Sequence, residues 1–128
     1  MDLFSLEGRK AVLLGGGGVL GAAMVKGLAD AGADVAVCDL DLERAQAVAD
    51  SVGKPAVKAY RVDAMDIESI KAAAEAIFKD FGRVDILVNA VGGNMKGATT
   101  SDEVSFFDLD AEMLNKVVKL NLMAGAVL

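Results

Sequence analysis

The sequence predicts an α/β fold in which helices cover both faces of a parallel sheet. Short apolar runs closed by glycine or aspartate alternate with segments that have the period of a helix. The alternation runs strand–helix four times, and such an order requires right-handed crossovers and parallel strands. The chain has 128 residues, of which 54% are hydrophobic, enough for the core of one domain. We therefore expect a single, doubly wound sheet.

The expected strands are four apolar runs. The first, KAVLL, ends at a run of glycines, and the second, DVAVC, follows Gly32. The third contains the only tyrosine and the only proline of the chain. Such short runs between turn residues are typical of buried parallel strands. The strands are expected at residues 10–14, 34–38, 55–62 and 84–88.

Four helices are expected between and after the strands. Asp41 and Asp66 stand where N-caps of the second and third helices belong, and Gly82 stops the third. A polar, glycine-rich loop follows from residue 89 to 108, and the last helix starts near Asp110. In the first helix, apolar residues recur at spacings of three and four and predict its buried face: Leu20, Ala23, Met24, Gly27, Leu28 and Ala31.

Composition excludes several classes of function. The net charge is −6 without a basic run, which argues against nucleic acid or an anionic membrane as a partner. The chain has no histidine, so it has no Ser-His or Cys-His nucleophile, and we expect no metal site. Cys38 is the only cysteine, which is typical of a reducing, cytoplasmic location. The uncharged run 11–25 contains five glycines and is shorter than a membrane span.

The run LGGGGVLG at residues 14–21 joins the first strand to the first helix. Glycines there let the backbone approach a pyrophosphate, while the helix N-terminus supplies free N–H groups and a positive dipole. Two registers fit: Gly16, Gly18 and Gly21 form GxGxxG, and Gly15 with Gly21 forms a looser pattern. A plain strand-to-helix turn is the alternative, although four successive glycines are costly for that purpose alone.

Two aspartates follow strands at the same edge of the sheet. Asp39 ends the second strand, 18 residues after Gly21, where a carboxylate can accept hydrogen bonds from both ribose hydroxyls and repel a 2′-phosphate. Leu40 offers no positive charge, so NAD is favoured over NADP. Asp63 ends the third strand, and its carboxylate could accept a hydrogen bond from the adenine amino group. The simpler alternatives are a helix cap for Asp39 and a solvated loop for Asp63.

These residues resemble the short-chain dehydrogenase/reductase family. Its cofactor motif T-G-x-x-x-G-x-G is matched by Gly15 and Gly21, with Leu14 and Val19 in place of the threonine and middle glycine. Its strand-four motif N-N-A-G reads Asn-Ala-Val-Gly at residues 89–92. The resemblance implies a cofactor site made of Gly15, Gly18, Val19, Leu20, Gly21, Asp39, Leu40, Asp63, Ala64, Asn89, Ala90, Val91 and Gly92.

The family also implies an architecture: a Rossmann half with strand order 3-2-1-4, one NAD(P)-binding domain over residues 1–128 that stops within the helix after strand four. From Leu120 onward this helix is apolar nearly all round, so we expect it to join copies in a homo-oligomer. Asn121 matches the asparagine that supports the family's proton relay; the alternative is a helix-bending asparagine whose hydrogen bonds are satisfied.

Catalysis in the family uses a serine that follows the fifth strand and a Tyr-x-x-x-Lys. These 128 residues contain no Tyr-x-x-x-Lys, and serines such as Ser101 and Ser105 precede the last helix. Tyr60 is the only tyrosine, and Ala64 stands four residues later. The glycine loop, together with the segments 92–94, 98–100 and 106–110, resembles D-mannonate (fructuronate) oxidoreductases. We therefore expect an NAD-dependent oxidoreductase for a small hydroxy or keto substrate such as a sugar acid, inactive as this chain alone. The alternative is a non-catalytic dinucleotide-binding module.

Overall fold

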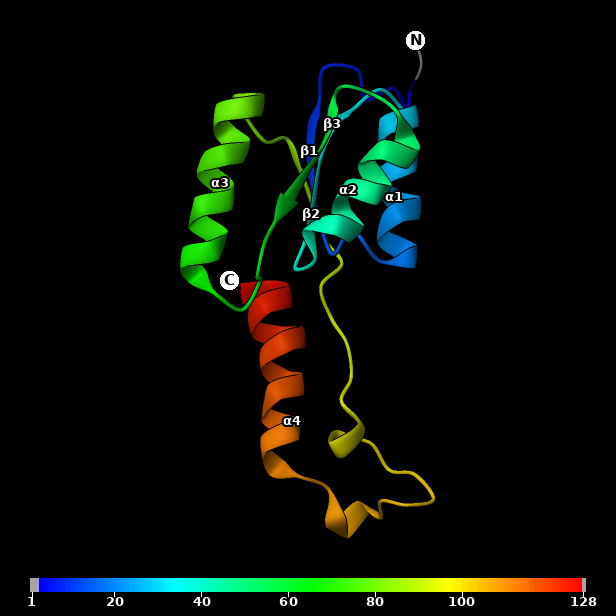
Figure 1. Cartoon of the computed structure of the whole chain (residues 1–128), viewed down its shortest axis with the longest axis vertical. Coiled ribbons are helices and arrows are strands. Elements are labelled where there is room, and N and C mark those ends of the chain that lie inside the picture. The colour runs from blue at the N-terminus through cyan, green and yellow to red at the C-terminus, as the bar shows by residue number, and fades with distance from the viewer. Residues whose placement is uncertain (1–2, 128) are drawn as a thin grey trace.

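The computed structural model describes residues 3–127, and its centre is a four-stranded parallel sheet in the order β3-β2-β1-β4. All three pairings are parallel, with Leu14 opposite Cys38 on one side and Asn89 on the other. This confirms the predicted fold class and strand order (Figure 1). The strands are β1 (Lys10–Leu14), β2 (Asp34–Asp39), β3 (Val57–Arg61) and β4 (Ile86–Asn89).

Three helices cover the two faces of this sheet. α1 and α2 lie on one face and α3 on the other, as Figure 1 shows. Asp41 caps α2 by accepting from the N–H groups of Glu43 and Arg44, and Asp66 caps α3, as predicted. Glycines in the left-handed conformation end α2 and α3. The bounds are α1 (Val19–Asp30), α2 (Leu42–Val52) and α3 (Ile67–Phe81).

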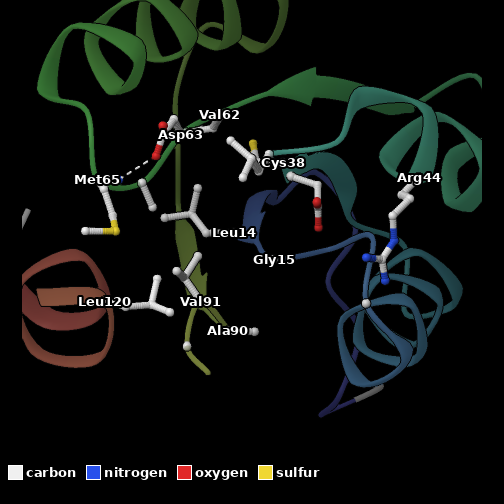
Figure 2. A pocket seen from close by; sticks show the side chains of 15 residues that line it. Leu14, Gly15, Cys38, Arg44, Val62, Asp63, Met65, Ala90, Val91 and Leu120 are labelled. Carbon is white, nitrogen blue, oxygen red and sulfur yellow. Dashed lines mark hydrogen bonds between the residues drawn. The ribbon is translucent and has the colours of Figure 1, made fainter. Parts of the chain in front are cut away.

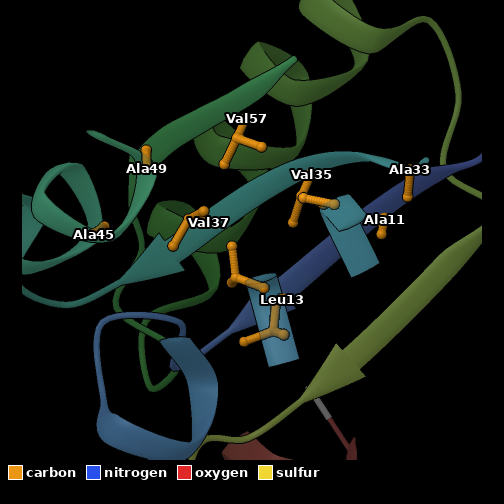
Figure 3. Close-up of a cluster of buried hydrophobic side chains, with 10 residues drawn as sticks. Ala11, Leu13, Ala33, Val35, Val37, Ala45, Ala49 and Val57 are labelled. Carbon is orange, nitrogen blue, oxygen red and sulfur yellow. The ribbon is translucent and has the colours of Figure 1, made fainter. Parts of the chain in front are cut away.

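The main core lies between the sheet and the α1–α2 layer (Figure 3). Leu13, Val35 and Val37 are fully buried there. The second core lies under α3 and contains the other faces of β1 and β2, including Val12 and Cys38. The two central strands are therefore apolar on both faces, as buried parallel strands are.

The expected buried face of α1 was wrong in its phase. The buried residues are Gly21, Val25 and Ala29, whereas Leu20 and Met24 are exposed. Gly21 lies so close to the carbonyl oxygen of Gly15 that no Cβ would fit between them, and Val25 and Ala29 follow Gly21 on the same face at spacings of four. Periodicity gives the spacing of a face, but a tertiary contact fixes which residues occupy it.

β1 has the expected bounds, and the ends of the other three strands differ from the expected ones by at most two residues. β2 continues to Asp39, because the carbonyl oxygen of Asp39 accepts from Val62 in the neighbouring segment. β3 begins at Val57 rather than Pro55, after a turn in which Val57 donates to Lys54. β4 begins at Ile86, two residues after the expected start.

The last part of the chain leaves the sheet and returns to it. After β4 a long loop includes two short 3₁₀ turns, Lys96–Ala98 and Phe106–Asp108. Asp110 then caps α4 (Ala111–Val118), which continues as a π-helical segment over Lys119–Val127. Figure 1 shows this helix below the sheet, with its C-terminal end at the edge where the strands end. Among the described residues, no helix is long and apolar enough to span a membrane.

Candidate functional site

A cavity of about 320 Å³ opens at the carboxyl ends of the four strands. This is the edge at which open α/β sheets bind ligands. It is lined by the ends of β1 and β2 and by the segments that follow all four strands. The lining residues are Leu14, Gly15, Gly18, Cys38, Asp39, Leu40, Arg44, Val62, Asp63, Ala64, Met65, Ala90, Val91, Gly92 and Leu120.

The geometry of the glycine loop distinguishes between the two glycine patterns that fit the sequence. Gly15 has a φ of 79°, and a Cβ there would lie 2.8 Å from the carbonyl oxygen of Ala90. A Cβ on Gly21 would collide with the carbonyl oxygen of Gly15. At Gly18 the nearest atom to a Cβ would be 3.6 Å away, an ordinary contact. A Cβ on Gly16 would also be crowded, at 2.6 Å from Cγ1 of Val37. The loop therefore requires glycine at positions 15, 16 and 21, and the space at Gly18 argues against the GxGxxG register.

The N-terminus of α1 has free donors that face the end of this loop. Gly18 is its N-cap and supplies no side-chain acceptor. Within residues 3–127, the N–H groups of Val19 and Leu20 have no hydrogen-bond partner. Their side chains are 89% and 78% exposed. Unpaired N–H groups combined with the positive end of the helix dipole form a site for an anion.

Asp39 is held beside the glycine loop by two backbone groups. One carboxylate oxygen accepts from the N–H of Gly17 at 2.9 Å, and the other from the N–H of Asp41 at 3.1 Å. Each oxygen keeps a second lone pair for an incoming hydroxyl. The alternative role as the cap of α2 is excluded, because Asp41 is that cap.

Asp63 lies at the far end of the cavity from the glycine loop. One of its carboxylate oxygens accepts from the N–H of Met65 at 2.9 Å, the bond drawn in Figure 2. Its own N–H donates to Ser69 at 2.9 Å, which fixes the turn before α3. Between Asp63 and Asp39 the wall is largely apolar, with Val62, Ala64 and Leu40 along it. This apolar wall suits a flat ring with the Asp63 carboxylate at its edge.

The segment after β4 is fastened to the last helix by two asparagines. Asn89 donates through Nδ2 to the carbonyl oxygens of Ala124 (3.2 Å) and Gly125 (2.7 Å). Asn121 accepts through Oδ1 from the N–H of Gly93 at 3.1 Å and donates through Nδ2 to the carbonyl oxygen of Gly93 at 2.7 Å. Asn121 also donates to Val117 one turn earlier, at 2.8 Å. Its amide is therefore satisfied, as the simpler interpretation expected, and it also links two segments.

Of the thirteen residues proposed for the cofactor, nine line the cavity. Val19 and Leu20 lie beside it in the first turn of α1, Gly21 lies beneath the loop, and Asn89 turns to the last helix. The sequence interpretation missed Arg44 and the apolar wall. An arginine on the first turn of a helix gives no sequence signal of its own, since only the fold shows which segment it faces. The cavity residues not foreseen are Leu14, Cys38, Arg44, Val62, Met65 and Leu120.

Two reactive side chains are structurally unsuited to chemistry at this site. Tyr60 is not among the cavity residues; its hydroxyl donates to Asp80 at 2.6 Å, and burial together with this hydrogen bond raises its pKa. Cys38 lines the cavity, but burial, together with the charge of Asp39, raises the pKa of its thiol to about 12. Across the described residues, no three acidic or thiol side chains gather in a way that could hold a metal ion.

Comparisons with known proteins identify relatives of similar sequence and fold. A D-threitol dehydrogenase from Mycolicibacterium smegmatis is 35% identical over 97% of this chain and 48% of its own length. A Haemophilus influenzae protein provisionally named a D-mannonate oxidoreductase, solved with bound NAD, has a TM-score of 0.89 and 35% identity, with 96% of this chain and 48% of that one covered. A 3-ketoacyl-(acyl-carrier-protein) reductase from Brucella melitensis, solved with NADH, has a TM-score of 0.81 and 32% identity over the same shares.

The chain spans about half the length of the curated relatives that it matches. The family model for short chain dehydrogenases matches residues 9–128, nearly the whole chain. The match thus includes the glycine loop, Asp39, Asp63 and the segment that Asn121 fastens. This chain belongs to the short-chain dehydrogenase family.

Proposed function

We propose that the chain binds NAD(H) in the cavity at the carboxyl edge of the sheet. The observation that supports this most directly is Asp39, whose carboxylate is held beside the glycine loop by the N–H groups of Gly17 and Asp41. The remaining lone pairs would accept from the adenosine ribose hydroxyls. The two solved relatives were solved with NAD and NADH.

The other parts of the cavity fit the remaining parts of a dinucleotide. The pyrophosphate would lie on the uncapped N-terminus of α1, where Val19 and Leu20 offer free N–H groups. The adenine would lie in the apolar slot that ends at Asp63, whose second oxygen would accept from the amino group. The nicotinamide half would then extend past Val91 toward the last helix.

We further propose that this site serves an oxidoreductase. Bound nicotinamide supplies hydride transfer to or from a carbon that carries a hydroxyl or carbonyl group. Within these residues, Asn121 acts as a positioning residue, because it holds the loop after β4 against the last helix. A D-threitol dehydrogenase and a protein named a D-mannonate oxidoreductase are among the relatives, so a polyol, sugar or sugar acid is the proposed substrate class.

Binding is tested by titrating the folded chain with NADH and following the dinucleotide fluorescence. We expect saturable binding that weakens at least about tenfold in Asp39→Ala, which loses two hydroxyl contacts, with a narrower gap between NADH and NADPH. Glu75→Gln is the charge-matched control, since Glu75 is exposed on α3 and away from the cavity. Equal affinities for Asp39→Ala and wild type would remove Asp39 from the site.

A second candidate, dinucleotide binding without turnover, has a specific observation in its favour. The only tyrosine is hydrogen-bonded to Asp80 and lies outside the cavity. We therefore expect this 128-residue chain to bind NADH but not to oxidise it with a keto sugar acid. Catalysis by pure chain that survives Tyr60→Phe would contradict the requirement for a tyrosine acid–base.

We also propose a homo-oligomer formed through the last helix. Leu114, Val118 and Leu122, at successive spacings of four, are about half exposed and form one apolar stripe. We expect light scattering to show an assembly that dissociates in the double variant Leu114→Ser/Leu122→Ser. Phe107→Ser is the control, because it removes an exposed apolar side chain from the loop instead. A monomeric wild type would contradict this proposal.

A further inference from the structure

Arg44 extends into the cavity from the first turn of α2. Figure 2 shows its guanidinium on the side of the glycine loop, at the opposite end of the cavity from Asp63. Within residues 3–127 this guanidinium has no hydrogen bond or ion pair, and none joins it to Asp39. The cavity thus contains one positively charged side chain that the protein leaves free.

Gly17 brings Arg44 and Asp39 to the same place. A Cβ built on Gly17 would lie 2.8 Å from a carboxylate oxygen of Asp39 and 2.9 Å from the Cβ of Arg44. The backbone of Arg44 is fixed as well, since its N–H donates to the Asp41 cap at 3.3 Å. The base of the arginine side chain therefore stands next to the carboxylate proposed to hold the ribose.

The position of Arg44 corresponds to one part of a dinucleotide. With the ribose hydroxyls on Asp39 and the adenine directed toward Asp63, a group on the 2′-oxygen would point toward Gly17 and α2. A guanidinium there matches a phosphate, because its planar fork donates two parallel hydrogen bonds. Leu40, directly after Asp39, supplies no such donor.

We infer that Arg44 is a specificity-determining residue that contacts the 2′-phosphate of NADP(H) and offsets the repulsion from Asp39. The site then accepts both dinucleotides, with NAD(H) preferred because Asp39 still binds the free hydroxyls. This inference rests on the proposed dinucleotide site and adds to it a side chain with a distinct ligand group. The expected preference for NAD over NADP is kept, and Arg44 adds a contact for the 2′-phosphate.

The test uses two ligands that differ only in the 2′-phosphate, 5′-AMP and adenosine 2′,5′-bisphosphate. In calorimetric titrations, Arg44→Gln should weaken the binding of the bisphosphate about tenfold or more relative to wild type and change the affinity for 5′-AMP less than about twofold. The affinity of Arg44→Lys for the bisphosphate should lie between those of wild type and Arg44→Gln, because lysine keeps the charge but cannot donate two parallel hydrogen bonds. Lys79→Gln, on the exposed surface of α3, is the charge-matched control and should behave as wild type.

Any other pattern of affinities would overturn either this inference alone or the proposed function as well. Equal weakening of both ligands by Arg44→Gln would overturn the inference, since it would place Arg44 on the part that they share. No change for either ligand would also overturn it, and in both cases the dinucleotide site itself would stand. If folded wild type bound neither ligand nor NADH, the proposed function would fail together with the inference.

Discussion

Asn121 and Gly93 hold each other by two hydrogen bonds, one in each direction between the asparagine amide and the glycine backbone. A third bond, from Asn121 to Val117, keeps the amide on its own helix. The pair joins two segments 28 residues apart, and a Cβ on the adjacent Gly92 would lie 2.7 Å from Oδ1 of Asn121. The loop after β4 is therefore set by a helix that packs little against the sheet.

We expect Asn121→Ala to loosen this loop. Asn121 and Gly93 are exposed, so water replaces the lost amide, and we expect the free energy of unfolding to fall by only about 0.5–1.5 kcal/mol. NADH affinity should fall as well, since Val91 and Gly92 line the cavity. Urea unfolding and NADH titration measure the two effects. Asn115→Ala, exposed on the same helix, is the control, and an equal loss in both variants would contradict a specific role.

Gly21→Ala and Gly18→Ala should differ sharply, although both lie in the same loop. The methyl group at Gly21 would meet the carbonyl oxygen of Gly15 and lie 2.8 Å from the Cα of Gly16, so the loop must shift. We expect a loss of about 2–3 kcal/mol and of NADH binding. At Gly18 there is space for a methyl group, and because alanine is a poorer N-cap than glycine we expect a loss of no more than about 1 kcal/mol. Equal melting temperatures for the two variants would contradict the register assigned here.

Cys38 should be unreactive in the folded chain. Burial raises the pKa of its thiol to about 12, so almost no thiolate is present near neutral pH. We expect 5,5′-dithiobis(2-nitrobenzoate) to leave folded protein unmodified at pH 8 and to label it fully in guanidinium chloride. Because the unfolded thiol ionises near its ordinary pKa of 9.0, stability should also decline as pH rises above that value. Rapid labelling of native chain would contradict this burial.

Asp85 should support the fold at neutral pH and lose that effect in acid. The N–H of Lys10 and the side chain of Arg83 hold the pKa of this carboxyl below its ordinary value of 3.8. Its stabilisation is therefore complete above that value and disappears as pH falls through the lower pKa of the folded state. Melting of wild type and Asp85→Asn between pH 2 and 7 should converge at the acid end. Glu75→Gln controls for the lost charge, and a difference independent of pH would contradict the prediction.

The sequence was sufficient for the parts of this fold that depend on local chemistry. Apolar runs located β1 to β4, and Asp41 and Asp66 cap the helices that their positions predicted. Asp39 and Asp63 were found because parallel strands deliver their carboxyl ends to one edge. Each of these inferences needs only neighbouring residues and a known topology.

What could not be predicted depends on contacts between distant segments. The face of α1 is set by Gly21 against Gly15, which no period reveals. The place of Arg44 depends on how α2 passes over Gly17. The pairing of Asn121 with Gly93 depends on the path of a long loop back to the sheet. Sequence spacing cannot fix these relationships, because it contains no information about the angle at which elements meet.

The strand order β3-β2-β1-β4 implies that different parts of the candidate cavity differ in how readily they unfold locally. β1 and β2 each have a neighbour on both sides, and Leu13, Val35 and Val37 are wholly buried in them. β3 and β4 are each paired on one side only. Amide hydrogen exchange should therefore be slowest in the central strands that lead to Gly15 and Asp39. In partly opened forms of the chain, the segments after the edge strands would detach first, while Gly15 and Asp39, the proposed contacts for the pyrophosphate and the ribose, would stay in place.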